Sequence, residues 1–166
     1  MVIAGIDAST KKTGIAIMND GKYETHVLLD HHKETDVHKR IELMVRDIWD
    51  TLDKFQPDVV RMEESMMTTN IDVVKKLSNL AGAVWTWCIM NQRPFVLILP
   101  TAWRKAIGLT QGKTKRDALK VEAMLAVKQE YGLEVTDDAA EAILVARSGF
   151  DLPKIVLPEN DDGWVI

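Results

Sequence analysis

The chain has 166 residues, a formal net charge of −4 and 46% hydrophobic residues, which is the composition of one soluble globular domain. It excludes a disordered tail, a collagen-like chain and a disulfide-stapled scaffold, since the single cysteine, Cys88, has no intramolecular partner. No apolar stretch reaches the ~18 residues that a membrane span needs, and no signal-peptide pattern opens the chain. We therefore expect a reduced, cytoplasmic setting without membrane contact.

The predicted elements begin with three strands and then alternate between helices and strands. Residues 2–9, 13–19 and 22–29 are predicted to form antiparallel strands, with a tight turn at Asn19-Asp20-Gly21. The elements predicted after them are helix 36–55, strand 59–63, helix 71–90, strand 94–99, a short helix 101–108, helix 114–131 and helix 137–148. This order predicts an α/β fold: a mixed five-stranded sheet flanked by helices, in one domain. In helix 114–131 we expect Ala118, Val121 and Leu125 to face inward.

Two acidic residues lie at the ends of otherwise apolar strands. Asp7 ends the first strand, and Glu63 ends the strand that follows helix 36–55. A carboxylate is costly to bury without a partner, so such a residue binds a metal, pairs with a cation or caps a turn. For Asp7 the turn-capping alternative stays open, because Ala8-Ser9-Thr10 follow it.

A third acidic segment opens the last predicted helix. Asp138 and Glu141 are three residues apart and so share a helix face. Acidic residues in a first helical turn also interact favourably with the helix dipole. Asp137 is a candidate N-cap. Carboxylates brought together from these segments repel one another unless cations lie between them, and hard ions such as Mg²⁺ or Mn²⁺ suit oxygen ligands. Two such ions roughly 3.5–4 Å apart are a common device for phosphodiester cleavage. No zinc site or small-molecule cofactor is indicated.

Residues 104–120 form a basic stretch in this acidic chain. They hold one acidic residue, Asp117, and six basic ones: Arg104, Lys105, Lys113, Lys115, Arg116 and Lys120. Such a stretch can bind a polyanion, or it can be a solvated loop and helix start. If it binds DNA phosphates, the binding should be independent of sequence and fall steeply with salt.

Three motifs follow one another along residues 2–148: Gly5-Ile6-Asp7-Ala8-Ser9-x-x-x-Thr13-Gly14-Ile15-Ala16; Met62-Glu63 with Met67, Asn70, Leu77 and Ala81-Gly82; and Asp138-Ala139-Ala140-Glu141-Ala142-Ile143. In this order and spacing the chain resembles the RuvC-type Holliday-junction resolvases (crossover junction endodeoxyribonucleases) of the ribonuclease H-like superfamily. Two departures are visible. Glu141 stands where the family usually has Asp, and Met66 stands where the family often has an aromatic residue. Such divergence resembles phage-encoded members, which would act in the host cytoplasm.

The resemblance implies a ribonuclease H-like nuclease domain over residues 1–150, with residues 151–166 as its C-terminal tail. It implies an endonuclease that cleaves four-way junctions and other branched DNA with two Mg²⁺ ions, which Mn²⁺ can replace. The implied metal ligands and catalytic acids are Asp7, Glu63, Asp138 and Glu141. The implied DNA contacts are Met66 and the six basic residues of the 104–120 stretch. A homodimer would form through helix 71–90, with Ser78, Ala81, Val84 and Trp85 facing the partner.

Three alternatives remain open at this level. The opening motif also resembles the phosphate loop of actin-like ATPases and sugar kinases, but the chain is too short for their two domains. A second alternative keeps the fold and changes the substrate, as in an RNA–DNA hybrid nuclease or a 3′ exonuclease. The third is a non-catalytic DNA-binding subunit, which an intact set of acidic residues disfavours.

Overall fold

Five strands form one mixed sheet in the order β3-β2-β1-β4-β5, in a computed structural model that describes residues 1–64, 70–110 and 115–157. The strands are β1 (Val2–Asp7), β2 (Lys12–Asn19), β3 (Lys22–Asp30), β4 (Val59–Glu63) and β5 (Phe95–Ile98). β1, β2 and β3 pair antiparallel, whereas β4 lies parallel to both β1 and β5. The predicted mixed five-stranded sheet is therefore confirmed.

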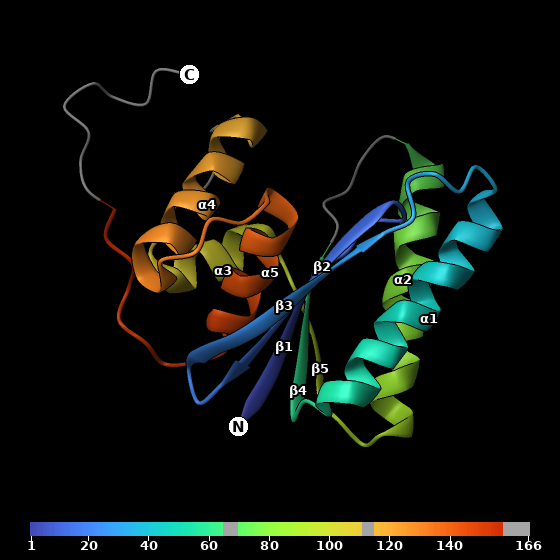
Figure 1. Ribbon diagram of the computed structural model, residues 1–166, viewed down its shortest axis with the longest axis horizontal. Coiled ribbons are helices and arrows are strands. Elements are labelled where there is room, and N and C mark those ends of the chain that lie inside the picture. Colours follow the sequence, from blue (N-terminus) through green and yellow to red (C-terminus); the bar gives the residue numbers. More distant parts are fainter. Residues whose placement is uncertain (65–69, 111–114, 158–166) are drawn as a thin grey trace.

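Helices cover both faces of this sheet (Figure 1). One layer consists of α1 (Val37–Phe55) and α2 (Ile71–Met90), and the other consists of α3 (Pro100–Ile107), α4 (Arg116–Tyr131) and α5 (Asp137–Arg147). The side chains of alternate strand residues point to opposite faces, and each face has its own core. Ile6 and Met62 pack toward α1 and α2, whereas Ala16 packs among residues of α3, α4 and α5.

Local sequence signals explain most element boundaries. Asp20 and Gly21 both have positive φ, 48° and 77°, which is the two-residue turn expected between β2 and β3. The Asp36 side chain caps α1 by accepting hydrogen bonds from two backbone amides at its start. Gly108 and Gly132 end α3 and α4 in the left-handed conformation.

The buried face of α4 differs from the prediction. Ala123, Ala126 and Val127 are fully buried, whereas Leu125, which was expected inside, is 36% exposed. Glu122 is also buried on this face and pairs with Arg104 of α3. The inner face of α4 therefore includes an ion pair that the apolar pattern did not indicate. In the described part of the chain, no helix is long and apolar enough to span a membrane.

Candidate active site

Asp7 and Glu63 lie at the same edge of the sheet, on the same face. β1 and β4 are parallel neighbours with Ile6 beside Met62, so their last residues, Asp7 and Glu63, end the two strands together. Ile6 and Met62 belong to the core under α1 and α2, and side chains alternate along a strand. The two carboxylates therefore face the opposite layer, which contains α5.

The turn that follows Asp7 is held by its own residues. The Ser9 hydroxyl accepts hydrogen bonds from the amides of Lys11 and Lys12, and the Thr13 hydroxyl donates to the Ser9 carbonyl. Ser9 and Thr13 therefore make the capping contacts that the sequence left open for Asp7. The Asp7 carboxylate is therefore not needed to cap this turn.

Small residues bring the start of α5 against this edge of the sheet. A Cβ atom added to Gly14 would lie 2.2 Å from the Asp138 carbonyl oxygen, and one added to Gly5 would lie 2.3 Å from the Ala142 carbonyl oxygen. Ala139 and Ala140 are fully buried. Contact this close is open only to glycine on the strands, and it sets Asp138 and Glu141 beside the ends of β1 and β4. Thr136, and not Asp137 as expected, caps the helix.

The four carboxylates lie near enough to perturb one another. Burial raises the pKa of Asp7 well above its ordinary value, and the negative charges of Glu63, Glu141 and Asp138 raise it further. Burial and the charge of Glu141 raise the pKa of Glu63 to about 7. Burial also raises the pKa values of Asp138 and Glu141. The acids predicted from three separate segments therefore form one electrostatic cluster.

Basic side chains act electrostatically on this acid cluster. Lys120 of α4 lowers the pKa of Asp7, while its ammonium group forms an ion pair with Asp137. Arg116 lowers the pKa values of Glu63 and Glu141. Lys12, at the start of β2, acts on Asp138 in the same direction. Lys12 was not among the predicted site residues, although it lies inside the first motif.

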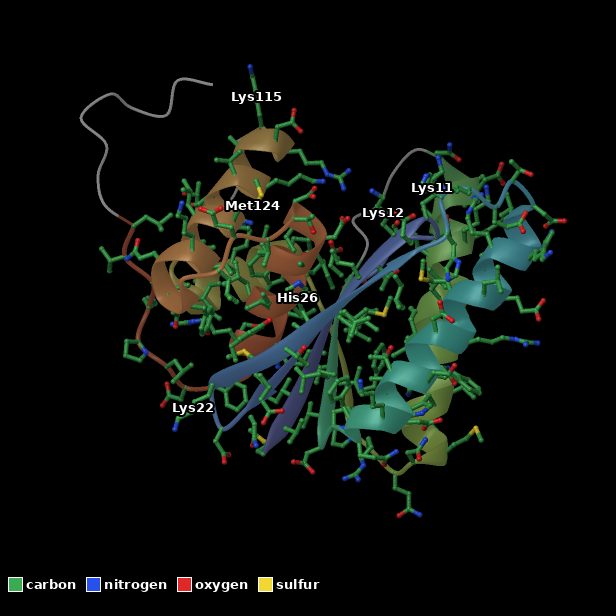
Figure 2. The ribbon with its side chains drawn as sticks, viewed as in Figure 1. Lys11, Lys12, Lys22, His26, Lys115 and Met124 are labelled. Atoms are coloured by element: carbon green, nitrogen blue, oxygen red, sulfur yellow. The ribbon has the colours of Figure 1, made fainter. Side chains whose placement is uncertain are left out.

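The other members of the basic stretch divide between surface and interior. Lys105, Lys115 and Arg116 are exposed, and Figure 2 shows Lys115 pointing away from the protein at the start of α4. Arg104 corrects the prediction: it is 3% exposed, and its guanidinium donates to Glu122 and to the carbonyls of Thr110 and Leu119. Arg104 is therefore a buried structural residue, and its charge also lowers the pKa values of Glu63 and Glu141. Lys113 and Met66 lie outside the described residues.

Sequence reasoning missed Trp103. Its indole Nε1 donates a hydrogen bond to Oε2 of Glu63 at 2.6 Å, and this bond lowers the pKa of Glu63 against the stronger effect of burial. The only sequence signal was a tryptophan in a short helix just after a strand. That signal does not identify a partner 40 positions away.

The donor set of the acid cluster suits a divalent ion. Carboxylate oxygens are the ligands that Mg²⁺ and Mn²⁺ prefer, and a cation among four repelling carboxylates would relieve the raised pKa values. Within the described residues, no three His, Cys, Asp or Glu side chains are gathered closely enough to hold a metal ion. Among the described residues, the acid cluster therefore fits a divalent ion by the chemistry of its oxygen donors and not by their spacing.

Comparison with known proteins gives the family. The family model "Crossover junction endodeoxyribonuclease RuvC" matches residues 3–148. The chain is 27% identical over 152 residues to the crossover junction endodeoxyribonuclease RuvC of Xanthomonas oryzae pv. oryzae, covering 87% of this chain and 84% of that protein.

Solved structures support the fold. Thermus thermophilus RuvC in complex with a Holliday junction substrate matches with a TM-score of 0.72 at 20% identity, covering 89% of this chain and 91% of that one. The fowlpox virus resolvase in complex with Holliday junction DNA matches with a TM-score of 0.57 at 16% identity, covering 90% and 96%. The ribonuclease H-like sheet order is thereby confirmed, and the ATPase and sugar kinase alternative loses its support. With an acid cluster at the expected strand ends and a family match over nearly its whole length, this chain belongs to the RuvC family of crossover junction endodeoxyribonucleases.

Proposed function

We propose that this endodeoxyribonuclease hydrolyses phosphodiester bonds at four-way DNA junctions with two divalent metal ions, Mg²⁺ or Mn²⁺, bound by Asp7, Glu63, Asp138 and Glu141. Nucleases of the RuvC family depend on divalent metal ions. The observation that carries the proposal is the convergence of four carboxylates, each with a raised pKa, from β1, β4 and α5. The Thermus thermophilus RuvC complex with a Holliday junction and the fowlpox virus resolvase complex support the substrate class.

The chain's own residues supply ligands and orientation. Asp7, whose pKa the other three acids raise, would hold the ions together with Glu63, Asp138 and Glu141. Divalent ions supply an activated water and stabilise charge on the leaving oxygen. Lys120 and Arg116 lower the pKa values of the acids, and we expect both to contact the phosphate that enters beside them. Bound divalent ions would offset the negative charge of the four carboxylates and so ease the approach of that phosphate.

DNA would approach across the exposed basic residues. Lys105, Lys115 and Arg116 stand at the surface, with Lys11 in the β1–β2 turn and Lys12 at the start of β2 (Figure 2). Lys12 acts electrostatically on Asp138, so the turn borders the acid cluster. Lys113 and Met66 are further proposed DNA contacts. Arg104 is not one, because its side chain is buried. Replacing Lys115 and Arg116 together should flatten the salt dependence of junction binding by about two phosphate contacts, and an unchanged slope would place the DNA elsewhere.

We further propose a homodimer through α2, because a two-fold symmetric junction needs two symmetric cuts. Two residues of the predicted interface face of α2 are exposed to solvent: Ser78, and Trp85 with 58% of its surface exposed. Ile89, one turn further along the helix, is 65% exposed. Val84 is 1% exposed and packs in the core, so it is removed from the interface. Sedimentation with and without junction DNA tests this proposal, and a monomer in both states would refute it.

The decisive experiment replaces Asp7 with Asn. Removing one negative charge should abolish cleavage of a four-way junction and leave junction binding unchanged or tighter, since phosphate repulsion falls. Asp50→Asn, on the exposed side of α1, is the control and should cleave normally. Parallel assays on an RNA–DNA hybrid and a frayed duplex separate the junction nuclease from the other nucleases of this fold. Near-normal turnover by Asp7→Asn would refute the metal role.

A further inference from the structure

We propose that Trp103 is a positioning residue for Glu63: its indole N–H holds one oxygen of the carboxylate and thereby orients the group for a divalent ion. This inference rests on the proposed function, since Glu63 is taken there as a metal ligand. It adds a residue outside the acidic motifs and the basic stretch. It also explains why a tryptophan occupies the interior of a short helix beside the site.

The hydrogen bond has a geometry that fixes a carboxylate. Trp103 is fully buried, and its Nε1 lies 2.6 Å from Oε2 of Glu63. An indole N–H donates one hydrogen bond and accepts none, and a buried one requires an acceptor. With Oε2 held in this way, rotation of the Glu63 carboxylate about its last bond is restricted. Oε1 remains the oxygen that the indole does not engage.

The fold brings Trp103 to Glu63 through the neighbouring strand. Glu63 lies beside Ile98, the last residue of β5, and the Glu64 amide donates to the Ile98 carbonyl at 2.8 Å. Two residues later Pro100 opens α3, because proline fits the first turn of a helix. The chain therefore turns over the end of the sheet at once, and the first turn of α3 carries Trp103 onto the end of β4.

The indole ring also contacts a cation. The Arg104 guanidinium carbon lies 5.0 Å from the centre of the Trp103 ring, within the range of a cation–π contact. Arg104 itself is fixed by Glu122 of α4 and by the Thr110 carbonyl. Trp103 is thus a rigid link between two helices and one acidic residue. Rigid outer partners of this kind orient metal ligands, and their loss costs about 10–100-fold in metal affinity or activity.

A second tryptophan offers a matched control. Trp87 of α2 is 2% exposed, and its Nε1 donates to Oδ1 of Asp53 at 2.8 Å. Asp53 belongs to α1 and is not among the main causes of the pKa shifts of the four clustered acids. Trp87 therefore donates an indole-to-carboxylate hydrogen bond like that of Trp103. The two side chains are similarly buried, but Trp87 lies away from the acid cluster. A purely structural role predicts similar behaviour for the two residues.

The experiment compares Trp103→Phe with Trp87→Phe, since each variant keeps an aromatic ring and removes the indole N–H. Two readouts are followed while Mg²⁺ is titrated: the cleavage rate on a four-way junction, and the thermal unfolding temperature of the protein without DNA. Trp103→Phe should need about 10-fold more Mg²⁺ for half-maximal response in both readouts. Trp87→Phe should lower the unfolding temperature without Mg²⁺ and leave the Mg²⁺ dependence unchanged.

The outcomes separate this inference from the proposed function. Wild-type protein that neither cleaves junctions nor responds to Mg²⁺ would overturn both. Normal wild-type behaviour with an unshifted Mg²⁺ dependence in Trp103→Phe would overturn the positioning role alone. If Trp103→Phe does not fold, nuclear magnetic resonance of the wild-type protein provides the test. The indole N–H signals are first assigned by replacing the other tryptophans and are then followed as Mg²⁺ is added. The Trp103 signal should then move with Mg²⁺ while the Trp87 signal stays, and a stationary Trp103 signal would refute the inference.

Discussion

Replacing Glu63 with Gln should stabilise the metal-free protein at alkaline pH while abolishing its nuclease activity. Glu63 is largely buried among like charges, and its pKa rises from an ordinary 4.5 to about 7 in the folded protein. Because the folded state binds the proton more tightly than the unfolded state, ionising Glu63 costs folding free energy. Glutamine has nearly the same shape, carries no charge and can still accept the Trp103 hydrogen bond through its amide oxygen.

The magnitude follows from the two pKa values. Below pH 4.5 the carboxyl is protonated in both states and carries no penalty. Between pH 4.5 and 7 the folded state holds more protons than the unfolded state, so the stability of the wild-type protein falls as pH rises. Above pH 7 the penalty is constant at about 3 kcal/mol, since one pKa unit corresponds to about 1.36 kcal/mol. For a chain of this length, that difference is roughly 6–12 °C in the unfolding temperature.

The assay is thermal unfolding of both proteins in EDTA at pH 4 and pH 8. Glu63→Gln should unfold at a higher temperature than wild type at pH 8 and at nearly the same temperature at pH 4. Adding Mg²⁺ at pH 8 should raise the unfolding temperature of wild type more than that of the variant. Glu24→Gln, at an exposed position of β3, controls for charge alone. A Glu63→Gln protein that is less stable than wild type at pH 8 in EDTA would refute the reasoning.

Two further substitutions test how the site is built. Gly14→Ala places a Cβ 2.2 Å from the Asp138 carbonyl oxygen. It should therefore displace the start of α5, lower the unfolding temperature and reduce cleavage. Arg104→Ala leaves the Glu122 carboxylate buried without its partner and should cost about 3–5 kcal/mol of folding free energy by denaturant titration; Lys105→Ala, on the exposed side of α3, should leave stability unchanged.

The acid cluster was predictable because each of its members carries a local signal. Asp7 and Glu63 lie at the ends of apolar strands, and Asp138 and Glu141 share a helix face. Period-2 and period-3.6 patterns report which face a residue occupies, and parallel strands end at a common edge. The element order was predictable for the same reason, and the observed strands and helices follow it closely.

The exposure of the residues in the basic stretch was harder to predict, because charge alone does not show whether a side chain is buried. Arg104 and Lys105 are neighbours in sequence, yet one is 3% exposed and the other lies at the surface. The difference is made by Glu122, which lies 18 positions further along and is buried with Arg104. The same pair lies on the buried face of α4, where the sequence pattern had placed Leu125.

The sequence by itself determined the order of the strands and helices, the four acids and the family, because these are properties of local patterns and of motif spacing. Only the tertiary structure decided which partners each charge and each indole would meet. Trp103 reaches Glu63 because β5 lies beside β4 and α3 turns back over the sheet, and Gly14 matters because α5 approaches its backbone. Burial, hydrogen bonding and pKa depend on distances between segments far apart in the chain, and those distances exist only once the two helical layers have closed on the sheet.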